Sequence, residues 1–176
     1  MKIAVFALMT LGGFTIPLAA GQPEVLQGSG INEEALRNAL VPKDGIRTRS
    51  FMPTSNQPCP EEIAIANILI TFPTGSADLT PLGQEQADMI ANVLKEDALK
   101  NCSFTIEGHA DPRGGAEFNR WLSEARARAL VEHLRKYIGV ERLTAVGKGA
   151  QELWNKLDPT HPNNRRVTVV RKSRQE

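Results

Sequence analysis

Asp111 and Arg126 stand fifteen positions apart in a segment that reads GHADPRGGAEFNRWLSEARARALVEHL. The residues before Asp111 predict a strand, and those after Gly115 predict a long amphipathic helix that carries Arg126. A strand–loop–helix unit holds a carboxylate and a guanidinium at a fixed separation. Such a pair can bind a zwitterion, because the carboxylate accepts from an ammonium and the guanidinium donates to a carboxylate.

Other reactive side chains nearby do not form a catalytic pattern. His109 stands close to Asp111, but no HExxH or similar ligand spacing occurs, and His133 and His161 are distant in sequence. We therefore interpret His109 as structural. Ser123 lies in no nucleophile-elbow pattern and is interpreted as a helix-packing residue. The sequence thus predicts no catalytic residue, no metal site and no cofactor.

The elements that position this unit are predicted within residues 61–173, which we expect to form one domain. Their order is β-α-β-α-β-β, an α+β sandwich in which right-handed crossovers place both helices on one face of a mixed sheet. Strands are predicted at 63–72, 103–107, 143–146 and 166–170, and helices at 80–99 and 116–137.

The N-terminal residues have the layout of a secretory signal peptide. Lys2 is followed by an apolar run over 3–16 and by small residues before Gly21. The run is short for a membrane span, so residues 1–20 predict an export signal and a mature chain without a transmembrane segment. Residues 21–60 are rich in Gly and Pro, with a brief helical patch at 33–40, and predict a flexible linker or arm.

Composition narrows the choice of partner. The chain has 176 residues and a formal net charge of +1. So balanced a charge does not favour binding to nucleic acid, and the basic residues near the C-terminus are interpreted as a solvated end.

Two cysteines, Cys59 and Cys102, each stand shortly ahead of a predicted strand. An exported protein folds in an oxidising compartment, where such a pair can form a disulfide. The bond requires the two segments to meet in space, and the sequence leaves this open.

Several motifs in a fixed order resemble the OmpA-like peptidoglycan-binding domain family. The HADPRG wording is most similar to that of peptidoglycan-associated lipoproteins, and the resemblance covers about residues 62–172. The motifs are ITF from Ile70, SADL from Ser76, IEGHADPRG from Ile106, FN from Phe118, LS from Leu122, RA from Arg126 and NRRV from Asn164.

The resemblance implies non-covalent binding of peptidoglycan through the diaminopimelate residue of its stem peptide. Asp111 would meet the ammonium of that residue, and Arg126 would meet its carboxylate. The rest of the implied ligand set is Asn119, Thr74, Ala110, Arg165 and Arg166.

This chain departs from the resembled proteins in how it would be attached. It has no cysteine near the predicted cleavage point to carry a lipid, and residues 21–60 are too short for a membrane barrel. We expect a periplasmic binding module, with its association to the outer membrane left open and other envelope proteins as partners of residues 21–60. The alternatives are a structural envelope protein that acts through protein contacts, and a cell-wall hydrolase.

Overall fold

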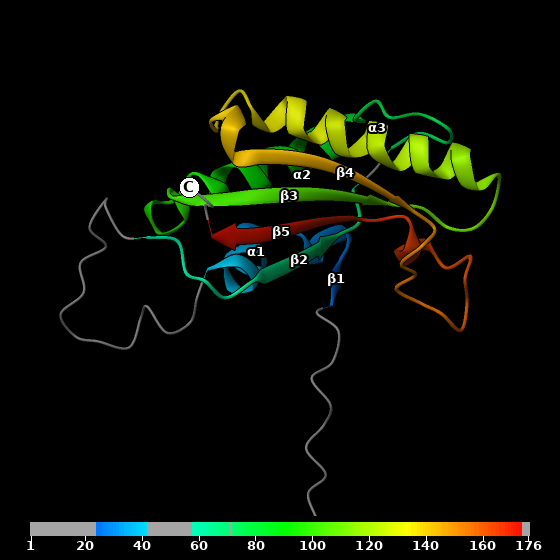
Figure 1. Cartoon of the computed structure of the whole chain (residues 1–176), viewed down its shortest axis with the longest axis horizontal. Helices are drawn as coiled ribbons and strands as arrows, with labels where there is room; N and C mark the ends of the chain where they lie inside the picture. The colour runs from blue at the N-terminus through cyan, green and yellow to red at the C-terminus, as the bar shows by residue number, and fades with distance from the viewer. Residues whose placement is uncertain (1–23, 42–57, 71, 174–176) are drawn as a thin grey trace, which may run out of the picture.

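The computed structural model describes residues 24–41, 58–70 and 72–173 (Figure 1). Within these ranges, three α-helices accompany one five-stranded mixed sheet, an OmpA-like α+β fold as predicted. The helices are α1 (Glu33–Leu40), α2 (Pro81–Leu94) and α3 (Ala116–Leu134). The strands are β1 (Val25–Leu26), β2 (Ala64–Ile68), β3 (Cys102–His109), β4 (Leu143–Gly149) and β5 (Val167–Ser173).

The sheet order β1-β2-β5-β3-β4 places the last strand between β2 and β3. β5 runs antiparallel to both neighbours, while the β1–β2 and β3–β4 pairs are parallel. Because β5 is antiparallel to β3, its first residue, Val167, lies opposite Gly108 near the end of β3. The backbone N–H of His109 also donates to the carbonyl of Arg166, at 2.9 Å. The NRRV motif is thereby brought beside the HAD motif.

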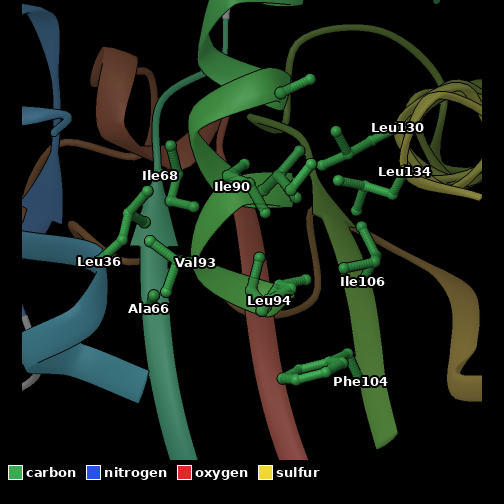
Figure 2. Close-up of a cluster of buried hydrophobic side chains, with 14 of the residues drawn as sticks. Leu36, Ala66, Ile68, Ile90, Val93, Leu94, Phe104, Ile106, Leu130 and Leu134 are labelled. Atoms are coloured by element: carbon green, nitrogen blue, oxygen red, sulfur yellow. The ribbon is translucent and has the colours of Figure 1, made fainter. Parts of the chain in front are cut away.

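Helices α2 and α3 pack against the same face of the sheet, as the crossover argument predicted (Figure 2). Helix α2 begins where its sequence suggests, because the Thr80 side chain accepts from the backbone N–H of Gly83 and Pro81 occupies the first turn. The core between the helices and the strands includes Ile90, Leu94, Leu130, Leu134, Ile68, Phe104 and Ile106.

Glycines allow α3 to lie unusually close to β3 and β4. A Cβ on Gly108 would stand 2.0 Å from the carbonyl oxygen of Ser123, and one on Gly147 would stand 2.6 Å from the Cβ of Glu124. Only glycine fits such an approach. The Ser123 hydroxyl also accepts from the backbone N–H of Gly149, at 2.9 Å, in agreement with its interpretation as a packing residue.

The prediction that residues 21–60 form a flexible arm is wrong for residues 24–41. Val25 pairs with Asn67 at the edge of the sheet, and Leu36 and Leu40 of α1 are fully buried in the core. The helical patch is amphipathic, with its leucines four residues apart and a side-chain cap at Asn32, so its apolar face is buried against the domain. The predicted signal peptide and residues 42–57 lie outside the described residues.

A disulfide joins Cys59 and Cys102, with 4.9 Å between the two Cα atoms. It connects the segment before β2 to the start of β3, although β5 lies between these strands. Among the described residues, no helix is long and apolar enough to span a membrane.

Candidate functional site

Asp111 is a buried carboxylate held by two arginines directly after β3. It is 5% exposed. Its Oδ2 accepts from Arg113 at 2.7 Å and from Arg165 at 2.8 Å, and its Oδ1 accepts from the Nε of Arg113 at 3.1 Å. Burial favours the neutral acid, but the hydrogen bonds from Arg113 and Arg165 outweigh it and lower the pKa of Asp111 to about 2. The side chain is therefore an anion at neutral pH.

The loop that carries Asp111 is fixed by neighbouring elements. The side-chain amide of Asn119, in the first turn of α3, donates to the backbone carbonyl of Asp111 at 3.0 Å. The backbone N–H of Ala110 donates to the carbonyl of Gly149 at 2.8 Å. Gly114 has a φ of 92°, a conformation that favours glycine, and lets the loop turn into α3. Asn119 and Ala110 thus position the carboxylate from their buried sites.

Arg126 lies on the face of α3 that meets the loop after β2. Its guanidinium donates to the carbonyls of Ser76 at 3.0 Å and Pro73 at 3.3 Å, and lies 5.1 Å from the centre of the Phe72 ring. These residues form a turn in which Thr74 is exposed. Burial, followed by the charge of Arg165, lowers the pKa of Arg126, while the charge of Asp111 raises it.

Asp111, Arg113, Arg126 and Arg165 form what we call the charged cluster. The cluster contains three guanidiniums and one carboxylate, a formal excess of two positive charges. Asp111 and Arg126 influence each other electrostatically, yet each is bonded to other groups: the acid to two arginines and Arg126 to two neutral carbonyls. The cluster can therefore accept an anionic or zwitterionic ligand, provided that the ligand exchanges with these partners.

The two arginines of the NRRV motif have different positions. Arg165 belongs to the charged cluster, whereas Arg166 is 8% exposed and donates to the side-chain oxygen of Asn67 at 3.2 Å. The guanidinium of Arg166 also lies 5.7 Å from the centre of the Trp154 ring. Arg165 is therefore the arginine of this motif that bonds to Asp111, and contact of Arg166 with a ligand stays a prediction.

The sequence analysis did not include Arg113 in the site. Its backbone N–H donates to the Asp111 carboxylate at 3.0 Å, and its side chain returns to the same group. The signal was the Asp-Pro-Arg order, because an aspartate at the start of a turn commonly accepts from the backbone two residues later. Once that turn forms, Arg113 lies within reach of the acid.

His109 is the last residue of β3 and belongs to a buried polar network. It is 2% exposed, and its Nε2 lies 3.2 Å from the hydroxyl of Thr168. Burial, followed by the charge of Arg166, lowers the pKa of His109 to about 3, so the ring is neutral at pH 7. This geometry agrees with a structural histidine.

Glu107, His109 and Glu152 place three potential metal ligands within 4.8 Å of one another. The ammonium of Lys148, however, lies 2.8 Å from Glu152 and 3.5 Å from Glu107. This lysine supplies the positive charge that a metal would supply, so we assign no metal to the group.

Known proteins resemble this chain in both sequence and fold. The sequence matches the OmpA family over residues 71–166. Outer membrane protein A of Buchnera aphidicola is 28% identical over 101 residues, covering 57% of this chain and 28% of that protein. The Serratia odorifera protein of the same name is 35% identical over 81 residues, covering 46% of this chain and 33% of its own length. This chain thus spans about a third of these relatives or less.

The solved OmpA-like domain of FopA1 from Francisella tularensis superposes with a TM-score of 0.52 at 23% identity, covering 65% of this chain and 75% of that one. This likeness identifies the fold as an OmpA-like domain, the class of protein already indicated by its β-α-β-α-β-β core. The family match covers more than half of the sequence, so it is sufficient to assign this chain to a family. The chain belongs to the OmpA family.

Proposed function

We propose that this protein binds peptidoglycan non-covalently by capturing the diaminopimelate residue of a stem peptide in the charged cluster. The observation that carries the proposal is a carboxylate that stays ionised, Asp111, beside a half-buried guanidinium, Arg126, on a rigid strand–loop–helix unit. The free end of diaminopimelate carries an ammonium and a carboxylate on one carbon. Asp111 accepts from the first, and Arg126 donates to the second.

The net charge of the site supports this ligand. The charged cluster has two positive charges in excess, and a stem peptide carries further free carboxylates besides the zwitterionic end. An anionic peptide therefore gains from the whole cluster, whereas a simple amine would meet three guanidiniums and gain from Asp111 alone.

Binding requires two exchanges of partner, and the present bonds allow both. The Arg113 side chain is 62% exposed, so it can leave Asp111 for solvent when an ammonium arrives. Arg126 gives up neutral carbonyls of Ser76 and Pro73 for a charged carboxylate, which forms the stronger hydrogen bond. Arg165 remains beside the bound zwitterion as a second cation.

The proposed role is that of a binding module of the cell envelope. The polar groups near Asp111 are hydrogen-bonded to one another in a way that orients charges, which supports a binding role. The curated relatives are outer membrane proteins by name, which supports a place in the envelope and, with the predicted export signal, in the periplasm. Contacts of residues 21–60 with other envelope proteins remain part of the proposal.

Calorimetric titration with a stem tripeptide that contains diaminopimelate tests the site. Asp111→Asn and Arg126→Ala should each weaken binding by more than about 30-fold, because each leaves a charge of the ligand unpaired in a partly buried site. Arg128→Ala is the matched control, since Arg128 is a 72% exposed arginine of the same helix paired with Glu124. It should bind as the native protein does.

A tripeptide with lysine in place of diaminopimelate tests the contribution of the ligand carboxylate separately from that of the ammonium. Lysine keeps the ammonium and lacks the adjacent carboxylate, so the native protein should prefer diaminopimelate, and Arg126→Ala should lose that preference. If native protein and Asp111→Asn sediment equally with purified sacculi and neither binds the tripeptide, the site is not the determinant and protein contacts become the function.

A further inference from the structure

We propose that Phe118 and Trp121 form an aromatic platform that binds the sugar to which the stem peptide is attached. Phe118 is 50% exposed and Trp121 is 60% exposed, and their ring centres lie 5.9 Å apart with planes tilted by 34°. Two large aromatic rings in contact with each other and with water, beside a candidate ligand site, mark a surface for binding. This proposal rests on the proposed function, because it identifies a second contact for the same ligand.

Phe118 connects the platform to the loop that carries Asp111. Phe118 precedes Asn119, whose side chain donates to the carbonyl of Asp111. A Cβ on Gly114 would lie 3.9 Å from the ring of Phe118 and 3.6 Å from the side-chain oxygen of Asn119. The loop after Asp111 therefore passes close to the first ring of the platform, and the second ring, Trp121, follows one turn later on the solvent-exposed side of α3, the helix that lies over the sheet in Figure 1.

The chemistry of the rings favours a sugar as the occupant. A pyranose presents one face of C–H groups, which packs against an aromatic ring, while its hydroxyl and acetamido groups stay at the edge in water. The indole of Trp121 offers a large flat surface, and the tilt toward Phe118 lets both rings contact one sugar. Glu117 and Arg120, exposed polar residues that each precede one of the rings in sequence, can meet the polar edge of such a ligand.

The spacing also agrees with a stem peptide. Two residues separate diaminopimelate from the lactyl group of the sugar, so with the linkages the sugar lies on the order of 10 Å from the bound zwitterion. Trp121 lies six residues beyond Gly115, which caps α3 at the level of the Asp111 loop, and this is about 9 Å along the helix axis. Because Trp121 lies on the solvent side of α3, a ligand held at Asp111 reaches it by passing over Phe118, which lies beside the Asp111 loop.

The test compares one peptide with and without its sugars. The native protein should bind a disaccharide-tripeptide about three- to tenfold more tightly than the free tripeptide, and Trp121→Ala should remove this gain without changing binding of the free tripeptide. Trp121→Phe, which keeps a ring, should restore part of the gain. Tyr137→Ala removes another exposed aromatic residue, beyond the opposite end of α3, and should leave the gain intact.

The outcomes separate this proposal from the one on which it rests. If the free tripeptide and the disaccharide-tripeptide bind the native protein equally, or if Trp121→Ala weakens both alike, the platform is overturned while the diaminopimelate site stands. If neither ligand binds, both proposals fail. A shift of tryptophan emission in Trp154→Phe protein on adding the disaccharide-tripeptide, and none with the free tripeptide, would support contact at Trp121.

Discussion

Two polar groups of residues lie at the same end of the sheet and differ in what they can do. The first is the charged cluster around Asp111. The second, which we call the buried polar network, consists of His109, Asn67, Thr168 and Arg166. His109 and Asp111 are two residues apart, and the consecutive arginines Arg165 and Arg166 are divided between the two groups.

The two groups differ in whether a ligand can replace the present hydrogen-bond partners. In the charged cluster, the side chains of Arg113 and Arg165 are 62% and 37% exposed, so their bonds to Asp111 compete with water. Every member of the buried polar network is less than 9% exposed, and Arg166 bonds to Asn67 inside the protein. A ligand can replace an exposed counterion, but it cannot reach a buried one. A dense set of polar residues therefore marks a binding site only where its partners are exchangeable.

The consecutive arginines give the most direct test of this comparison. Arg166→Met should lower the free energy of unfolding by about 2–3 kcal/mol, because it removes donors from a buried site. Arg165→Met should change the free energy by less than about 0.5 kcal/mol, since its bond is partly exposed, and should weaken binding of the stem tripeptide. Urea unfolding measures the stability of both variants, and calorimetric titration measures their affinity for the stem tripeptide. Equal losses of stability would contradict the division into two groups.

The pH dependence of stability tests the buried polar network by itself. The folded pKa of His109 is about 3 and the ordinary value is 6.5, so the unfolded chain takes up a proton that the folded protein excludes. The stabilising effect is complete above about pH 6.5 and is lost as the pH falls toward 3. From pH 7 to pH 5, the free energy of unfolding should fall by about 2 kcal/mol through this residue.

His109→Gln is the variant for this measurement, because it keeps a polar side chain and cannot titrate. Its stability at pH 7 will be lower, so the informative quantity is the difference between pH 7 and pH 5. That difference should be smaller by about 2 kcal/mol than in the native protein. An unchanged pH dependence would show that His109 does not exclude the proton.

Most of the fold could be predicted from the sequence because its elements have strong local signals. The alternating strand before Asp111 and the long amphipathic helix after Gly115 are found as β3 and α3, each with bounds shifted by a few residues. The position of β5 between β2 and β3 carries no local signal, since it depends on pairing between segments that are distant in the chain. For the same reason, composition alone suggested an arm at residues 24–41, where Leu36 and Leu40 complete the core.

Only some residues of the candidate site could be predicted, because the others depend on how distant parts of the chain, or the turn after Asp111, are arranged. The family motifs indicated Asp111, Asn119 and Arg126. In the structure, Asn119 bonds to the backbone of Asp111, and the charge of Asp111 acts on Arg126, whose hydrogen bonds go to the loop after β2. Which arginine of the NRRV motif faces Asp111 is decided by how the chain enters β5, and the sequence did not specify this. Arg113 was missed because its importance comes from a turn that folds its side chain back onto the acid.

The smallest expected effect concerns Arg113, which we expect to act as a counterion that the ligand replaces. In Arg113→Ala, the pKa of Asp111 should rise from about 2 toward its ordinary value of 3.8, as read from carboxyl chemical shifts, with Arg165 still holding it below that value. The stability that Asp111 contributes is present above about pH 3.8 and is lost as the pH falls through 2. In the variant the folded pKa lies closer to 3.8, so the pH range over which this stability is lost should be narrower.

Binding at pH 7 then distinguishes a replaceable counterion from a ligand contact. If the ligand ammonium takes the place of Arg113 at Asp111, Arg113→Ala should bind the stem tripeptide within about threefold of the native affinity, as Arg128→Ala does. A loss of more than about tenfold would mean that Arg113 contacts the ligand directly, and the charged cluster would then bind with all three of its guanidiniums. Asp111 stays ionised at pH 7 in both the native protein and the variant. The calorimetric titration therefore reports whether the ligand replaces Arg113 at Asp111, and not a change in the charge of the acid.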